Sequence, residues 1–210
     1  GLLGSLRVAR QQGARSIFVF DHWKNYAAHF LPDVLPDHIV VADETGREAL
    51  LEAIGQEHAS RVSILPHLGI EAAVARIQAY SLRLPGVVAV LLDPTESRDQ
   101  LGYDWRSVVH EIGLRAQAMP DTIFHIKPHP RQNIQEVKAF LLQEGMPADR
   151  FVLVDMDTEE LIAAVDEVWG MTTIALVAAL KAGKLIKSIQ TGRNAKGIIA
   201  SNHIIEPFVN

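Results

Sequence analysis

A stiff, basic corner is formed by the sequence His-Ile-Lys-Pro-His-Pro-Arg-Gln, residues 125–132. Lys127 and His129 each precede a proline, and a residue before proline is held in an extended conformation. The corner has little backbone freedom left, so it would present both residues at the end of a strand with a low ordering cost on binding. An ammonium group close to an imidazole suits a phosphate or a carboxylate. The alternative is a purely structural turn, and a lone histidine by itself favours that alternative.

A second candidate loop, Gly-Met-Thr-Thr, begins at Gly170. Glycine lets the backbone approach a ligand closely. We expect Thr172 and Thr173 to open a helix, where free backbone N–H groups and the positive end of the helix dipole favour an anion. One of the two threonines could instead be a simple helix cap. Together with the corner at residues 125–132, this loop indicates a nucleotide or nucleotide-sugar site.

An acid–base pair is suggested by Asp21 and His22, which follow the first apolar run of the chain. At the end of a strand they could act in a cleft between two lobes, with Trp23 and Tyr26 stacking on a sugar or a base. The alternative is a helix start, in which Asp21 is the cap and the aromatic side chains enter the core. The sequence does not decide between the two. If the chain is catalytic, Asp21 and His22 are the predicted position of the base.

Strands that alternate with helices must position these loops. Short apolar runs predict strands at residues 16–20, 39–42, 62–65, 86–93, 122–126, 151–155, 166–170 and 184–189. Helical patterns separate most of them, with predicted caps at Thr45, Asn133 and Asp157, each followed three residues later by a glutamate. This alternation predicts an α/β fold with parallel sheets. In such sheets ligands bind at the carboxyl ends of the strands, which is where the candidate loops lie.

Two Rossmann-like parallel-sheet lobes are expected from this order of elements. We predict an N-terminal lobe over residues 1–68, a linker helix over 69–85 and a nucleotide-binding C-terminal lobe over 86–210. The chain opens with a helical pattern that no strand precedes, so we expect the N-terminal lobe to be incomplete.

Composition excludes several classes of function. The 210 residues are 48% hydrophobic and 21% charged, as in ordinary globular proteins. A net charge of −5 without a long basic run argues against nucleic acid as a partner. There is no cysteine, which fits a reducing compartment, and we expect a cytoplasmic location without a transmembrane segment. Motifs of serine hydrolases, P-loop NTPases and NAD dehydrogenases are absent.

No metal site is predicted from the sequence. Asp155 and Asp157 form an Asp-x-Asp pattern, but Asp157 is better explained as a helix cap. The histidines have no spacing that is typical of metal ligands.

The Lys-Pro-His-Pro motif, followed about forty residues later by a hydroxyl pair that opens a helix, resembles bacterial sialyltransferases and polysialyltransferases. More broadly it is similar to capsule-polysaccharide and teichoic-acid transferases of the GT-B class. The resemblance covers residues 86–190. It implies a GT-B fold in which His129, Pro130, Thr172 and Thr173 line the donor site and hold the phosphate of the nucleotide. The family's hydroxyl motif usually begins with serine, and its acidic general-base motif is not visible here.

These observations predict transfer of a sugar or polyol phosphate from a CMP-, UDP- or CDP-linked donor to a glycan or lipid-linked acceptor, without a metal or other cofactor. Lys127 and His129 would neutralise the donor phosphate, and Asp21 or His22 would deprotonate the acceptor hydroxyl. Two alternatives stay open: a nucleotide-sugar epimerase of similar fold, and a binding module without catalysis. Peripheral membrane contact is compatible with the sequence, and the oligomeric state is not indicated.

Overall fold

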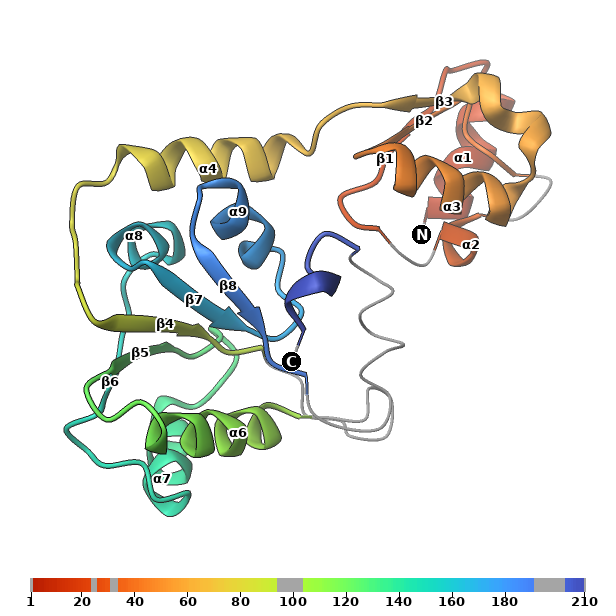
Figure 1. Ribbon diagram of the computed structural model, residues 1–210. Helices are drawn as coiled ribbons and strands as arrows, with labels where there is room; N and C mark the ends of the chain where they lie inside the picture. The colour runs from red at the N-terminus through yellow and green to blue at the C-terminus, as the bar shows by residue number, and fades with distance from the viewer. Residues whose placement is uncertain (1, 24–25, 31–33, 94–103, 191–202, 210) are drawn as a thin grey trace. The chain divides into compact units, whose positions relative to one another are not determined.

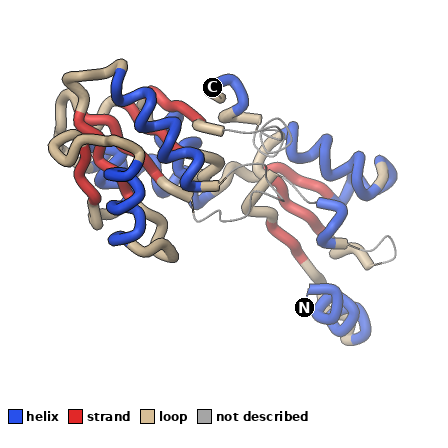
Figure 2. Tube along the Cα trace, turned by 90° about the horizontal axis from the view of Figure 1, so that it is seen from below, coloured by secondary structure: helices blue, strands red, loops and turns tan. Residues whose placement is uncertain are grey.

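The chain folds into two compact α/β units, Gly1–Gly69 and Ile70–Asn210, each built on a parallel sheet (Figure 1). The computed structural model describes residues 2–23, 26–30, 34–93, 104–190 and 203–209. Figure 2 shows the strands of each unit running side by side among their helices. The predicted α/β class with two parallel sheets is confirmed.

The first unit has a three-stranded sheet in the order β1-β2-β3. Its core gathers large apolar side chains of the sheet and of α2 and α3, among them Phe20, Tyr26, Ile39, Val41 and Leu50. The elements of this unit are α1 (Leu2–Gln11), β1 (Ile17–Val19), α2 (Tyr26–His29), β2 (His38–Val41), α3 (Glu44–Ile54), the 3-10 helix η1 (Gln56–Arg61) and β3 (Val62–Ile64).

The second unit has a five-stranded parallel sheet in the order β6-β5-β4-β7-β8. The chain builds outward from β4 in one direction and then from β7 in the other, so the strand order reverses between β4 and β7. The elements are α4 (Leu68–Ala79), β4 (Val87–Leu91), α6 (Trp105–Gln117), β5 (Ile123–Lys127), α7 (Ile134–Gln143), β6 (Phe151–Leu153), α8 (Thr158–Ala164), β7 (Glu167–Gly170), α9 (Ala175–Lys181), β8 (Leu185–Ser188) and the 3-10 helix η2 (Glu206–Phe208).

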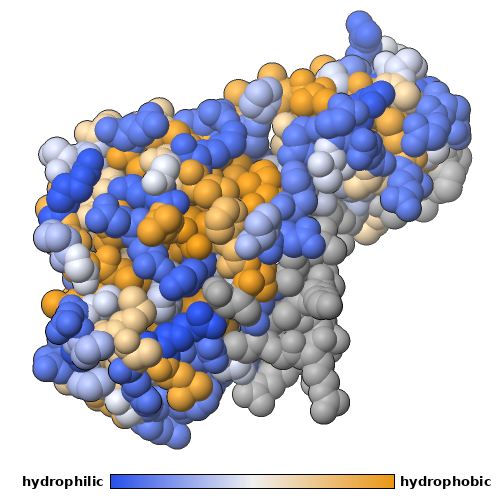
Figure 3. All heavy atoms as spheres, viewed as in Figure 1, coloured by the Kyte–Doolittle hydropathy of each residue, from blue (hydrophilic) through white to orange (hydrophobic). Residues whose placement is uncertain are grey.

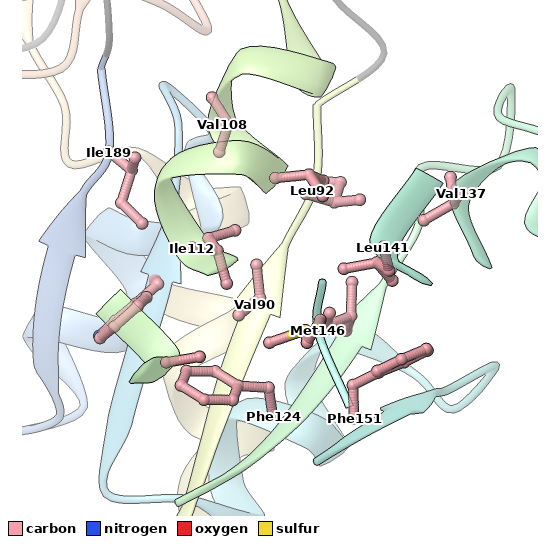
Figure 4. Close-up of a cluster of buried hydrophobic side chains, with 14 of the residues drawn as sticks. Val90, Leu92, Val108, Ile112, Phe124, Val137, Leu141, Met146, Phe151 and Ile189 are labelled. Carbon is pink, nitrogen blue, oxygen red and sulfur yellow. The ribbon is translucent and has the colours of Figure 1, made fainter. Parts of the chain in front are cut away.

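Helices cover both faces of this five-stranded sheet. In Figure 1, α6 and α7 lie on one face, and α4, α8 and α9 lie on the other. The core under α6 and α7 is fully buried at Val90, Ile112, Phe124 and Leu141, which point toward one another in Figure 4. Packing on both faces explains why the central strands read as continuous apolar runs in the sequence.

The helix starts agree only in part with the predicted caps. Asn133 caps α7 as expected, because its Oδ1 accepts the N–H of Gln135 at 2.9 Å. Asp157 stands at the N-cap position of α8 but makes no side-chain cap bond. The predicted cap at Thr45 is wrong. Asp43 has the extended backbone of a cap and accepts the N–H of Gly46 at 2.8 Å, so α3 begins earlier and includes Thr45 in its first turn.

Helix α4 is fastened to the second unit. Ile70 and Ile77 are buried, and two ion pairs join α4 to the helices beside it. Arg76 donates to Glu159 of α8 at 2.6 Å, and Lys181 of α9 donates to Glu71 at 2.5 Å.

The Arg76–Glu159 pair has a pH signature. The hydrogen bond from Arg76 holds the pKa of Glu159 below its ordinary value of 4.5. A lowered pKa stabilises the folded state above pH 4.5, and the stabilisation fades as the pH falls through the lowered folded value. We therefore expect Arg76→Ala to move the pKa of Glu159 up toward 4.5, as measured by carboxyl ¹³C NMR.

The same substitution should reduce stability near neutral pH, and the difference from the wild type should shrink in acid. Arg47→Ala is a matched control, since Arg47 pairs with Glu44 in the first unit. It should leave the titration of Glu159 unchanged. Identical Glu159 titrations in the wild type and in Arg76→Ala would contradict the prediction.

None of the helices in the described parts of the chain combines the length and the apolar character that crossing a bilayer needs. The face seen in Figure 3 carries hydrophilic side chains interspersed with hydrophobic ones.

Candidate functional site

A pocket of about 130 Å³ lies at the carboxyl ends of the strands of the second unit, beside the point where the strand order reverses. This is where open α/β sheets bind their ligands. Its floor and walls come from the end of β4, the corner after β5, the start of α8 and the segment before α9. The residues that line it are Leu91, Leu92, Lys127, Pro128, His129, Pro130, Thr158, Thr173 and Ala175.

Two loops far apart in the sequence meet at this pocket. Lys127, His129 and Pro130 come from the corner after β5, and Thr173 comes from the loop after β7. Gly170 and Thr172 are not among the lining residues. The structure thus brings four of the six predicted phosphate-binding residues together and places the other two beside them.

Lys127 is the last residue of β5 and is half-buried. Its Nζ donates to the carbonyl oxygen of Met156 at 2.6 Å, which fixes the ammonium group near the start of α8. An ammonium has three N–H donors, so this bond leaves two for a ligand.

His129 has a defined ring orientation. The backbone N–H of Arg131 donates to its Nδ1 at 3.2 Å. Because Nδ1 accepts, the hydrogen of the neutral ring is assigned to Nε2. His129 therefore offers an N–H donor at Nε2, as a phosphate oxygen requires.

The two threonines differ in their surroundings. Thr172 donates its hydroxyl to Oδ2 of Asp93 at 3.3 Å, so its hydrogen is directed to a carboxylate. Thr173 accepts the N–H of Ala175 at 3.3 Å, which leaves its hydroxyl hydrogen for the pocket.

The expected helix start at Thr172 and Thr173 is wrong by two residues. Helix α9 begins at Ala175, with Ile174 at the N-cap position, and has only seven residues. Thr173 has already bonded the first N–H of that helix. Side chains, rather than a helix dipole, are therefore what this loop offers to an anion.

Gly170 has a packing explanation. A Cβ at this last residue of β7 would lie 3.2 Å from Cγ2 of Thr173 and 3.3 Å from Cδ1 of Leu176. The missing side chain lets the loop and α9 fold closely over the end of β7. The sequence had suggested close approach of a ligand instead.

Thr158 lines the pocket although it is not among the site residues predicted from the sequence. It is the first residue of α8 and directly follows the predicted cap at Asp157. A hydroxyl just inside a predicted helix start after a strand is the signal that would have found it.

The Asp21–His22 pair lies in the first unit, on the loop after β1. Nδ1 of His22 donates to Oδ1 of Asp21 at 2.6 Å, since an ionised carboxylate only accepts. This bond lowers the pKa of Asp21 below 3.8, so the carboxyl stays ionised at neutral pH. Nε2 of His22 is then the nitrogen that can take up a proton. Such an arrangement is chemically able to act as a general base.

The aromatic residues of the same loop are engaged by the protein itself. Trp23 stacks on His67 with ring centroids 6.0 Å apart, and its Nε1 donates to Asp43 at 2.7 Å. Tyr26 is buried in the core, and burial raises the pKa of its hydroxyl to about 12. Asp21 does not cap a helix, since α2 begins at Tyr26. The helix cap of the structural alternative is therefore wrong, while its placing of Tyr26 in the core is confirmed. The role of Asp21 and His22 as an acid–base pair stays a prediction.

Among the residues that the structure describes, no group of three or more histidine, aspartate or glutamate side chains is placed to hold a metal ion.

Comparison with known proteins gives one kind of similarity. No family model matches the chain, and no curated protein matches its sequence. Among solved structures, the chain is similar to a "putative UDP-N-acetylglucosamine 2-epimerase" from Listeria monocytogenes, with a TM-score of 0.62 and 12% identity. The chain has a GT-B-like fold. The match covers 94% of this chain but only 56% of that one, so the chain spans just over half the length of its neighbour. At this identity the likeness shows the fold alone.

Proposed function

We propose that this chain binds a nucleotide-activated sugar through the pocket of its second unit and transfers the sugar, or a polyol phosphate, to a glycan or lipid-linked acceptor. The observation that carries the proposal is the meeting of Lys127, His129 and Thr173 at one pocket. An ammonium, an imidazole N–H and a hydroxyl are three donors suited to phosphate oxygens.

In a glycosyl transfer, the bond between the sugar carbon and the donor phosphate breaks, and a bond from that carbon to the acceptor oxygen forms. The nucleotide leaves with the bonding electrons, and its growing negative charge is stabilised by Lys127 and by Nε2–H of His129. The acceptor hydroxyl gives its proton to Nε2 of His22, whose ring Asp21 orients. In this proposal the Lys127 ammonium and the Nε2–H of His129 supply the charge stabilisation, without a metal.

Epimerisation of a nucleotide-sugar is the second candidate, because the neighbour from Listeria monocytogenes is described as an epimerase of that kind. The same pocket would hold the same phosphate. Incubation with a labelled nucleotide-sugar separates the two reactions. Transfer requires an acceptor and releases free nucleotide, whereas epimerisation needs no acceptor and yields an epimeric nucleotide-sugar. A chain that binds the nucleotide and does neither would be a binding module.

Two substitutions test the pocket itself. We expect Lys127→Ala and His129→Ala each to weaken nucleotide binding by about 10- to 100-fold, because a hydrogen bond to a charged group contributes about 1.5–3 kcal/mol. Isothermal titration calorimetry with CMP, UDP and CDP measures the affinities and shows which base the chain prefers.

Lys138→Ala and His110→Ala are matched controls in the same unit. Lys138 is exposed on α7, and His110 pairs with Glu144 on the surface. Both should keep wild-type affinity. Wild-type affinity in both pocket variants, or no binding of any of the three nucleotides, would refute the proposed site.

A further inference from the structure

One side chain, that of Gln132, joins the corner after β5 to the end of β4. Its Oε1 accepts the backbone N–H of His129 at 2.7 Å, and its Nε2 donates to the carbonyl oxygen of Asp93 at 3.4 Å. Its own backbone N–H donates to the carbonyl oxygen of His129 at 2.8 Å. A glutamine amide has both an acceptor and donors, so one side chain can make both side-chain bonds.

The bond to the N–H of His129 matters because of the prolines on either side. Pro128 and Pro130 have no backbone N–H, so His129 carries the single backbone donor of this three-residue segment. Without Gln132, that donor would have to find water or another partner, and the stiff corner leaves little room to rearrange. Gln132 thus holds the backbone that carries the imidazole.

The ring of His129 depends on the same turn. Its Nδ1 accepts the N–H of Arg131 at 3.2 Å, and Arg131 lies between His129 and Gln132 in the chain. The two hydrogen bonds between His129 and Gln132 therefore stabilise the turn. In this turn the N–H of Arg131 points at the ring of His129. This turn decides that Nε2, and not Nδ1, carries the hydrogen offered to a ligand.

Both pocket loops, the corner after β5 and the loop after β7, form hydrogen bonds to Asp93 just past the end of β4. The carbonyl oxygen of Asp93 accepts from Gln132, and its carboxylate accepts from Thr172 in the loop after β7. The hydrogen bond between Gln132 and Asp93 thus fixes the position of the corner after β5 relative to β4, the strand that lies between β5 and β7.

We propose that Gln132 is the positioning residue of the donor-phosphate pocket: it holds His129 with Nε2–H toward the phosphate and fixes this corner to the end of β4. The inference rests on the proposed function. Gln132 is not among the lining residues, so it acts through His129 and not by touching the nucleotide.

A double-mutant cycle tests this inference. Affinities are measured for the wild type, Gln132→Ala, His129→Ala and the double variant, with whichever of CMP, UDP and CDP the wild type binds most tightly. We expect Gln132→Ala alone to weaken binding by roughly three- to thirtyfold, within the range of couplings between contacting residues. In the His129→Ala background it should cause no further loss, because the ring that it positions is gone.

A spectroscopic signature makes the test independent of nucleotide affinity. Imidazole ¹⁵N NMR should show the Nε2–H form of His129 in the wild type and a mixture of the two neutral forms in Gln132→Ala. If Gln132→Ala does not fold, Gln132→Met keeps the length of the side chain, removes both polar atoms and should behave in the same way. Gln135→Ala, at an exposed position of α7, is the matched control and should change neither measurement.

Separate outcomes overturn the inference and the proposed function. An equal loss of affinity from Gln132→Ala with and without His129, or an unchanged ring form, would show that Gln132 does not act through His129. Unchanged affinity in both Lys127→Ala and His129→Ala would instead remove the proposed phosphate site.

Discussion

Replacing His22 by alanine is expected to lower turnover of the nucleotide-sugar by about 10²- to 10⁴-fold, which is the contribution that a general base usually makes. The expectation follows from the bond between Nδ1 of His22 and the ionised Asp21, at 2.6 Å, which leaves Nε2 as the proton acceptor. Affinity for the nucleotide should stay unchanged, because the proposed phosphate-binding residues belong to the second unit. A loss in kcat without a loss in affinity is therefore the result to look for.

His58 provides a matched control for this substitution. It lies in the same unit, and its Nε2 is 3.7 Å from the neighbouring carboxylate of Glu57, so it is also a histidine beside an acidic residue. His58→Ala should keep wild-type turnover. Asp21→Asn should lower turnover as well, since an amide can donate to the ring and so favour the wrong neutral form. Full activity in His22→Ala would place the base elsewhere.

The fold could be predicted from the sequence because a strand that is buried on both faces of the sheet gives a continuous apolar run. Residues 86–93 form an apolar run without alternation, and β4 (Val87–Leu91) is found there. Val88 and Val90 pack under α6 and α7, while Ala89 and Leu91 are buried on the opposite face. A strand packed on one face only would have alternated and would have been harder to separate from a loop.

The local geometry of the loops was less accessible. Asp43 and Thr45 are both good cap residues, and only the extended backbone at Asp43 decides between them. Thr172 and Thr173 likewise suggested a helix start. The hydroxyl of Thr173 instead accepts the N–H of Ala175, and α9 begins at Ala175. Choices of this kind depend on backbone angles set by the packed sheet, which short-range sequence signals do not contain.

The candidate site shows the same division. The corner at Lys127 and His129 was visible because prolines mark it, and its position after a strand placed it at the sheet edge. Gln132 was not visible, because its role depends on a bond to Asp93, a residue 39 positions away in the chain. Sequence patterns report which residue types are present, whereas such partners become evident only when the strands are ordered in space.

Phe124→Ala is expected to destabilise the second unit by about 3–5 kcal/mol, the usual cost of removing a buried aromatic side chain. Phe124 is completely buried in β5, and its ring centroid lies 5.5 Å from that of Trp169. Its strand neighbours in the register are Val88 and Phe151, and it packs in the core cluster with side chains of α6 and α7, so the cavity would open between the sheet and these helices. Little can move in to fill it, because backbone bonds fix the strands on both sides.

Tryptophan fluorescence during urea unfolding measures this loss. Trp105 and Trp169 belong to the second unit and Trp23 to the first, so a Trp23→Phe background restricts the signal to the second unit. Ile123→Ala is the matched control on the same strand, since Ile123 is 39% exposed, and it should cost much less. Equal losses of stability in Phe124→Ala and Ile123→Ala would contradict the burial of Phe124 in the core.

The Phe124→Ala variant also distinguishes an effect on the stability of the second unit from an effect on nucleotide affinity. Because Lys127 and His129 are positioned by hydrogen bonds to Met156 and Arg131 and not by Phe124, the folded fraction of Phe124→Ala should bind nucleotide with wild-type affinity. Nucleotide at about 100 times its Kd should then restore about 2.7 kcal/mol of the lost stability, as mass action requires. If nucleotide stabilises the wild type but not Phe124→Ala, the core side chain also shapes the pocket. The end of β5 would then depend on packing as well as on the bonds around Lys127 and His129.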